Sequence, residues 1–181
     1  RLELTLDKSQ PAKSFGLDLR TAVGRVKLDG GAVEVFFSAA PPVAMIRVPG
    51  PRPKWRIVAP ASLKQLGYAD PQTGSEGETS WTVQEAALGL KCAVVVAGRR
   101  VGQSTVIALT VTSTRDGPDP LALGRQRVAA ALDAGFDAVF QAHAAWWKQF
   151  WSQSSVRLPN AAAQQHYDLV QYFYGAASRR G

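Results

Sequence analysis

Alternating apolar and polar residues predict β structure over the first two thirds of the chain. Residues 2–6 place a leucine at every second position, which is the period of a strand with one buried face. The same alternation recurs at 33–37 and 105–111, whereas 92–96 is a continuous apolar run, as expected for a strand covered on both faces. Turns rich in glycine and proline separate these segments. The pattern predicts a mainly β protein with an antiparallel β-sandwich domain over 1–115.

The apolar period changes from that of strands to that of helices near residue 116. Asp119 is a suitable N-cap and Pro120 a suitable first residue for a helix that runs to about Ala134, and Gly135 would interrupt it. A second helix then carries one apolar face, made of Phe136, Phe140, His143, Trp147 and Phe150. A third helix begins near Asn160, with a stripe of Ala163, Tyr167, Val170, Tyr174 and Ala177. Residues 116–181 are therefore predicted to be a helical part that follows the sandwich.

The composition of the 181 residues excludes several classes of protein. The 46% of hydrophobic residues can form a core, and no apolar run reaches the roughly 18 residues that a membrane span needs. A single cysteine, Cys92, and two histidines favour neither a disulfide scaffold nor a structural zinc site. The chain carries no phosphate-binding or dinucleotide-binding glycine motif, so we expect no cofactor and no metal.

The chain is basic, with 21 Lys and Arg against 14 Asp and Glu. These basic residues are scattered, and prolines interrupt their densest stretch, 47–56, so that no helix can present them as one stripe. A solvated basic surface is therefore favoured over nucleic-acid binding. The chain begins at Arg1 without a signal-peptide pattern and ends directly after an apolar helical pattern, and we expect it to be part of a longer protein.

The ionisable side chains do not assemble into a convincing catalytic group. His143 lies on the aromatic helix face, which favours a packing or hydrogen-bonding role, and His166 is expected to be exposed. Glu34 and Glu85 fall on predicted strands, and we expect both to point to solvent from a polar face. Two carboxylates in the loop 70–79 remain as weak candidates for a sugar site, although a solvated loop is the favoured interpretation. These two carboxylates are Glu76 and Glu78.

Five tryptophans offer flat apolar surfaces that could pack or bind a sugar ring. Trp55 and Trp81 lie in or beside strands, where core packing is favoured over a sugar-binding platform. The other three crowd one helix together with Phe150, and we expect this cluster to dock the helix onto the sheet or onto a neighbouring domain. These three are Trp146, Trp147 and Trp151.

One segment resembles a known family. Residues 143–154, HAAWWKQFWSQS, resemble the H-x-x-W-W-x-x-F-W-x-R-S linker of family 95 and family 65-like glycoside hydrolases, although Gln153 stands in place of the family's arginine. Residues 15–22, FGLDLRTA, resemble a strand pair of the sandwich domain that precedes such catalytic domains. The helix at 119–136 fits the same linker, and 156–181 resembles the entry into the first helix of the catalytic domain.

The resemblance implies a supersandwich like that of galactose mutarotases, a helical linker, and an (α/α)6 barrel of the same parent chain that would hold the catalytic residues beyond Gly181. It implies that this chain alone is inactive, and that its aromatic cluster packs between domains: His143, Trp146, Trp147, Phe150 and Trp151. Without the barrel, the isolated chain is expected to expose an apolar patch and to self-associate. The resemblance also suggests a bacterial protein that is secreted to the extracellular space or periplasm, in which loop 70–79 reaches the rim of a sugar pocket.

Two other readings of the sequence stay open. The chain could be a free-standing carbohydrate-binding or interaction module that uses Trp55 or Trp81, and glycan binding lost in Trp→Ala variants would favour this reading. It could also bind polyanions electrostatically, in which case affinity would fall steeply with salt.

Overall fold

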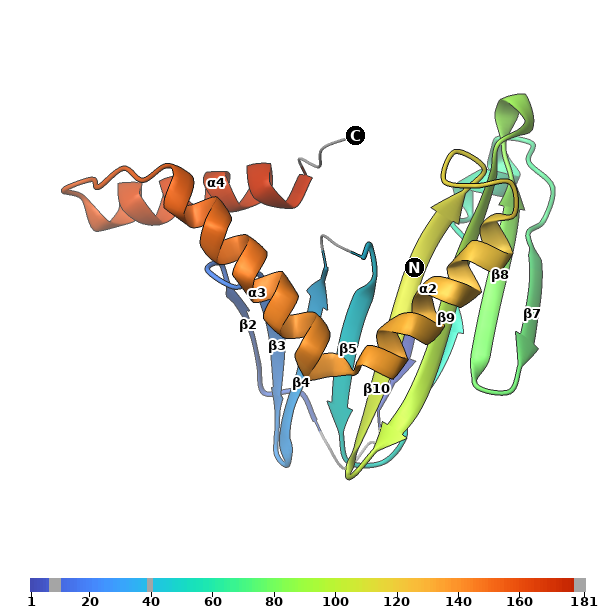
Figure 1. Ribbon diagram of the computed structural model, residues 1–181, viewed down its shortest axis with the longest axis horizontal. Coiled ribbons are helices and arrows are strands. Elements are labelled where there is room, and N and C mark those ends of the chain that lie inside the picture. The colour runs from blue at the N-terminus through green and yellow to red at the C-terminus, as the bar shows by residue number, and fades with distance from the viewer. Residues whose placement is uncertain (7–10, 39–40, 178–181) are drawn as a thin grey trace.

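The computed structural model describes residues 1–6, 11–38 and 41–177 and contains one large antiparallel sheet with a different layer on each face (Figure 1). Across this sheet the strands are β2 (Ser14–Asp18), β3 (Val23–Leu28), β4 (Gly31–Phe37), β5 (Ala44–Pro49), β10 (Ser104–Ser113), β9 (Lys91–Val101), β8 (Thr79–Glu85) and β7 (Gln72–Glu76). The strands β1 (Leu2–Thr5) and β6 (Lys54–Ile57) form a separate two-stranded antiparallel sheet. Short helical turns are α1 (Ser62–Gln65) and η1 (Ala87–Gly89).

Three longer helices follow the last strand. These are α2 (Pro120–Ala134), α3 (Phe136–Gln153) and α4 (Ala161–Ala177). Helices α2 and α3 cross one face of the large sheet, α2 over β9 and β10 and α3 beside β5, whereas α4 extends beyond the sheet (Figure 1). The prediction of a mainly antiparallel β fold followed by helices is confirmed. None of the helices in the described residues is long and apolar enough to cross a membrane.

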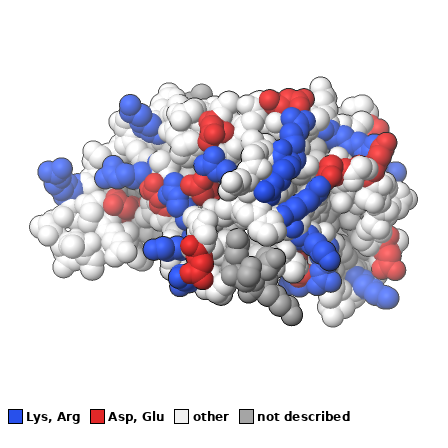
Figure 2. Space-filling model, turned by 90° about the horizontal axis from the view of Figure 1, so that it is seen from below, with Lys and Arg blue, Asp and Glu red and all other residues white. Residues whose placement is uncertain are grey.

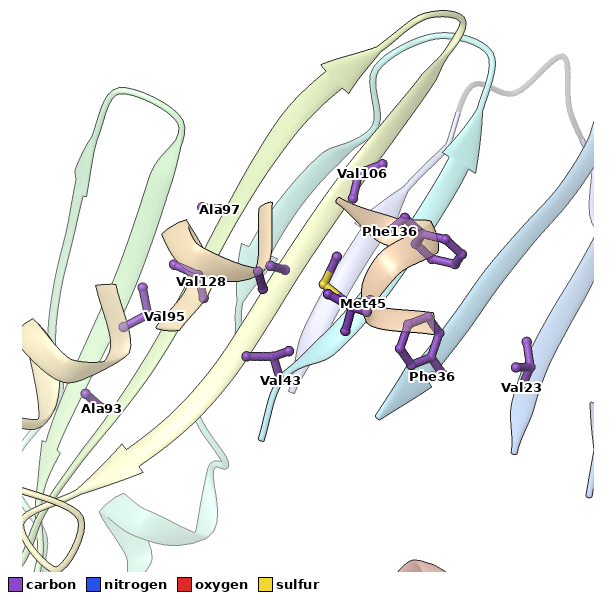
Figure 3. Packing of buried hydrophobic residues seen from close by; sticks show 13 residues of the cluster. Val23, Phe36, Val43, Met45, Ala93, Val95, Ala97, Val106, Val128 and Phe136 are labelled. Carbon is purple, nitrogen blue, oxygen red and sulfur yellow. The ribbon is translucent and has the colours of Figure 1, made fainter. Parts of the chain in front are cut away.

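The first core lies between the large sheet and the helices (Figure 3). Strands β4, β5, β9 and β10 contribute buried side chains to this core, among them Phe36 and Met45. The helices contribute Val128 from α2 and Phe136 from α3, and the ring of Phe136 meets that of Phe36 edge to face at 5.2 Å between centroids. Because the two helices share this core with the sheet, they are held to it by apolar burial rather than by the connecting chain alone.

The second core lies on the opposite face, under the two-stranded sheet. Leu2, Leu4, Trp55 and Ile57 of β1 and β6 pack on buried residues of the large sheet. Ile107 of β10 is one of these buried residues. Since the middle of the large sheet is therefore covered on both faces, the continuous apolar run in β9 has the environment that its sequence predicts.

Local sequence signals fix the helix boundaries. The Asp119 carboxylate accepts a hydrogen bond from the Ala122 backbone N–H at 2.9 Å, directly ahead of Pro120, so this N-cap prediction is confirmed. Gly135 separates α2 from α3 with a φ of 84°, a left-handed conformation that glycine adopts without strain. Asn160 caps α4 through the Ala163 N–H at 3.0 Å.

The apolar stripe of α4 in the sequence does not coincide with the side of the helix that is buried. Val170 and Tyr174 are exposed, whereas Tyr172 and Gly175 contact α3. Apolar residues occur on several sides of this helix, so its period identifies a helix but does not say which side is buried. Residues 178–181, which the resemblance includes, lie outside the described residues.

Candidate functional site

The four weak candidates for a sugar site do not form one site. The prediction of a loop over 70–79 is wrong, because Gln72–Glu76 is the strand β7, which pairs with β8. Between the two strands only a turn remains, and Gly77 in it has a φ of 55°. Glu76 pairs with a residue of α2 on the helix-covered face of the sheet, whereas Glu78 pairs with a residue next to β6 on the opposite face. The two tryptophans are divided in the same way, Trp81 with the first core and Trp55 with the second.

Trp55 and Glu78 are joined through one arginine. Arg52 forms an ion pair with Glu78, and its guanidinium lies over the Trp55 ring at 5.2 Å from the centroid. The ring also rests on Gly98, where a Cβ would come within 2.6 Å of it. The indole of Trp55 thus already has partners in the protein and packs as the sequence interpretation favoured.

Glu76 and Trp81 have partners of their own. Glu76 accepts a hydrogen bond from Arg125 of α2 at 2.9 Å, which links the β7 edge to the helix layer. The Trp81 ring covers Gly74 of the neighbouring strand so closely that a Cβ there would lie 2.3 Å from the ring. Glu76 and Glu78 therefore both have a basic partner. They do not face each other across a shared space, as the two carboxylates of a glycoside hydrolase must.

The prediction that Glu34 points to solvent from a polar face is wrong. Its side chain lies on the helix-covered side of β4, where it accepts hydrogen bonds from Arg25 at 3.1 Å and from Arg47 at 2.6 Å. Burial raises the pKa of this carboxyl, but the hydrogen bonds from Arg47 and Arg25 outweigh burial, and the pKa is lowered. Arg47 also forms an ion pair with Asp137 at the start of α3, so these charged residues join the sheet to that helix. Glu85, in contrast, is exposed and pairs with Lys91.

His143 anchors α3 to the turn between β2 and β3. It is 1% exposed, and its Nε2 lies 2.8 Å from the carbonyl oxygen of Thr21, to which the ring nitrogen donates. Its ring also lies 4.6 Å from that of Phe36 in the first core. Burial lowers the pKa of His143, and the backbone hydrogen bond only partly opposes this effect, so the imidazole is held neutral.

Trp147 and Trp151 continue the inner stripe of α3. Trp147 is buried, and its ring stacks on Tyr172 of α4 at 5.4 Å between centroids. The Trp151 indole N–H donates to the carbonyl oxygen of Leu19 at 3.1 Å, in the same turn that His143 holds. Trp151 thus holds α3 to the β2–β3 turn, whereas Trp147 packs on α4.

One side of α4 forms an outer aromatic surface. We define this surface by the exposed residues Val170, Phe173 and Tyr174. The rings of Trp146 and Phe150 of α3 stack in parallel at 5.6 Å and lie towards α4, where Phe150 packs beside Gly175. Phe173 and Tyr174 are 59% and 65% exposed, although aromatic side chains of this size are usually buried. An aromatic-walled pocket of about 230 Å³ lies between the two helices, with Trp146, Trp147 and Tyr172 among its lining residues.

A wider groove lies between the β2–β3 turn and the connection from α3 to α4. It has a volume of about 690 Å³, and Trp151 and Tyr167 are the aromatic residues that line it. Arg20, Arg157 and Asp168 give it charged walls. Asp18 also lines the groove, but its carboxylate already accepts hydrogen bonds from the Thr21 hydroxyl and the Arg20 backbone N–H.

The net positive charge does not produce one basic face. Figure 2 shows Lys and Arg next to Asp and Glu over the face that it presents. Ion pairs account for this mixing, for example Arg99 with Asp133 and Arg56 with Glu3. Among the described residues, no three His, Cys, Asp or Glu side chains lie close enough together to hold a metal ion.

No protein-family model and no curated protein matches this sequence. The fold does match solved structures, one of which is described as "Putative kojibiose phosphorylase from human microbiome". The match has a TM-score of 0.62 at 11% sequence identity and covers 95% of this chain. This chain spans 31% of the length of that protein. The likeness includes the sandwich and the helices together, and the two proteins therefore share this fold.

Proposed function

We propose that this chain is a non-catalytic part of a carbohydrate-active enzyme that resembles family 65 glycoside hydrolases. The observation that carries the proposal is the fold match over 95% of this chain to a protein described as a kojibiose phosphorylase. The H-x-x-W-W-x-x-F-W segment of α3 supports the same assignment independently of the fold. In this proposal, residues 1–115 are an N-terminal sandwich domain and residues 116–181 are the linker and the start of a catalytic helical barrel.

The proposed role of the chain is to hold the catalytic domain in position. The inner stripe of α3 is fixed to the sheet through His143 and Trp151. The outer aromatic surface is left to contact the catalytic domain, and its exposed rings would bury apolar area that is unfavourable in water. The same surface would make the isolated chain self-associate.

Catalytic groups are proposed to lie outside this chain. Glu34, Glu76 and Glu78 are each engaged by an arginine. Glu76 and Glu78 also lie on opposite faces of the sheet, so they do not face each other across a bond as a pair of catalytic carboxylates must. A carbohydrate-binding module that uses Trp55 or Trp81 is less well supported, because both rings already pack on a glycine of the sheet.

The first experiment is the intact mass of the natural protein, isolated from its own cells with an antibody against this chain. A mass several times 19.4 kDa, together with turnover of a disaccharide or an aryl glycoside, is the expected result. The 181-residue chain assayed alongside should show no turnover. A natural mass near 19.4 kDa would refute the proposal and would favour a free-standing module.

A second experiment tests the outer aromatic surface. Replacing Phe173 and Tyr174 by serine should reduce the self-association of the 181-residue chain in sedimentation velocity, because the two rings are the most exposed of that surface. Gln165→Ser, at an exposed position of the same helix, is the matched control. Equal association of both variants would show that the surface does not mediate contacts.

A further inference from the structure

The groove between the β2–β3 turn and the α3–α4 connection has no part in the role proposed for the chain. Its volume of about 690 Å³ falls within the range of about 300–1,000 Å³ that is usual for small-molecule sites. Its lining combines charged, hydroxyl, amide and aromatic side chains, whereas aromatic rings dominate the smaller pocket between α3 and α4. A mixed lining of this kind suits a polar small molecule better than an apolar side chain.

Two arginines of this groove have no partner among the described residues. Arg20 in the β2–β3 turn and Arg157 in the α3–α4 connection both line it. No hydrogen bond or ion pair engages either guanidinium in the described part of the chain, although the backbone N–H of Arg20 donates to Asp18. Most other arginines in these ranges do have partners, for example Arg99 with Asp133. Two unpaired guanidinium groups thus line one groove.

The groove also contains two carboxylates, and hydrogen bonds within the chain already engage both. Asp18 accepts one bond from the Thr21 hydroxyl at 2.6 Å and another from the Arg20 backbone N–H at 3.0 Å. Asp168 accepts a bond from the side-chain amide of Gln164 at 2.9 Å through one of its oxygens. Among the described residues, neither carboxylate forms an ion pair with an arginine. The guanidinium groups can therefore bind an anion from solution, and the other oxygen of Asp168 can accept a bond from a hydroxyl group.

The remaining lining residues suit a carbohydrate. Trp151 and Tyr167 supply flat apolar rings, on which the C–H face of a sugar ring can pack. Ser154 and Ser155 add hydroxyl groups that can donate or accept hydrogen bonds. A guanidinium offers paired N–H donors that match the oxygens of a carboxylate or a phosphate. Together these groups match a sugar that bears an anionic group.

Both walls of the groove are held in place by contacts within the chain. The Trp151 indole N–H donates to the carbonyl oxygen of Leu19 at 3.1 Å, which fixes α3 against the β2–β3 turn. The side chain of Gln164 accepts from the Leu158 backbone N–H at 2.8 Å, which fixes the connection against α4. A ligand would therefore meet a preformed site, and little conformational entropy would be lost on binding.

We propose that this groove binds a sugar that carries one anionic group, either a carboxylate or a phosphate. The anionic group lies between Arg20 and Arg157. The sugar ring contacts Trp151 or Tyr167, and Asp168 accepts a hydrogen bond from a ring hydroxyl. Two arginines against two carboxylates leave the groove without a net charge, so a single anionic group with hydroxyl groups is favoured over a polyanion. The site lies wholly within this chain, so the inference goes beyond the proposed function and does not depend on it.

Isothermal titration calorimetry on the natural protein tests this proposal, with glucuronate, glucose 6-phosphate and glucose as ligands. At least one of the two anionic sugars should bind, and the result identifies the anionic group. Arg20→Gln and Arg157→Gln should each weaken this binding about tenfold, because hydrogen bonds to a charged group are lost. Both arginines are exposed, so we expect the variants to fold. The matched control is Arg115→Gln, at an exposed arginine outside the groove that also has no charged partner among the described residues.

Glucose is the neutral comparison, and neither groove variant should change its binding. Failure of both anionic sugars to bind at millimolar concentrations would overturn the proposal. Binding to Arg20→Gln and Arg157→Gln as tight as to the parent would also overturn it, because the ligand would then lie elsewhere. An equal loss in Arg115→Gln would show a general effect of charge and would contradict a site in this groove. The mass and the turnover of the natural protein decide the proposed function separately.

Discussion

Gly124 sets the distance between α2 and the sheet, and replacing it by alanine tests how closely the two layers are packed. A Cβ at this position would lie 2.6 Å from Cγ2 of Val95 and 3.2 Å from Oγ1 of Thr112. Val95 is fully buried in the central strand β9, so its branched side chain cannot move away into solvent. In an exposed helix, the same substitution would stabilise the protein by about 1 kcal/mol through helix propensity.

The contact with Val95 should reverse that sign. Overpacking a tight core costs about 1–3 kcal/mol, so we expect Gly124→Ala to lower the free energy of unfolding by up to about 2 kcal/mol after the gain in helix propensity. For a protein of this size, each kcal/mol corresponds to about 2–4 °C in Tm. Urea unfolding followed by circular dichroism measures the effect, and Ala129→Gly at an exposed position of α2 measures propensity alone. A Gly124→Ala variant that is about 1 kcal/mol more stable than the parent would refute the close contact.

Three further changes test the contacts that hold α3. Burial lowers the pKa of His143, so the unfolded state takes up a proton at a higher pH than the folded state does. The free energy of unfolding should therefore decrease as the pH falls from about 6.5. A His143→Gln variant whose stability depends on pH in the same way would contradict this. Glu34→Gln should cost about 1 kcal/mol in low salt and less in high salt, measured by urea unfolding, because it weakens the pair with Arg47. Trp151→Phe should cost about 1 kcal/mol, because it removes the donor to the Leu19 carbonyl; unchanged stability would show that this bond contributes nothing.

The alternation of residues predicts strands well but misleads about Glu34. In β4, Val33 and Val35 face the second core, and the sequence pattern assigns the positions between them to solvent. One of those positions is Phe36, which is buried under α3, and Glu34 lies on the same side. The helix that covers this side comes a hundred residues later in the chain. A pattern within one strand cannot show this, although an apolar residue beside two apolar neighbours, as at Phe36, is a signal that both faces are covered.

The candidate carboxylates show the same limit for a site. Glu76 and Glu78 are two residues apart, and this spacing alone suggests a shared location. The turn at Gly77 sends them to opposite faces, and their partners Arg125 and Arg52 are distant in the sequence. Long-range ion pairs leave no local pattern. His143 was predictable because its position on an aromatic stripe already indicated burial.

The dense aromatic segment of α3 is explained by two stripes on one helix. His143, Trp147 and Trp151 are spaced four residues apart and face the sheet and its β2–β3 turn. Trp146 and Phe150 are also four residues apart, but they lie about 100° away around the helix, where they stack on each other and Phe150 packs beside Gly175 of α4. The second stripe therefore packs α4 against α3. The exposed rings of α4, Phe173 and Tyr174, are the feature that a neighbouring domain would account for.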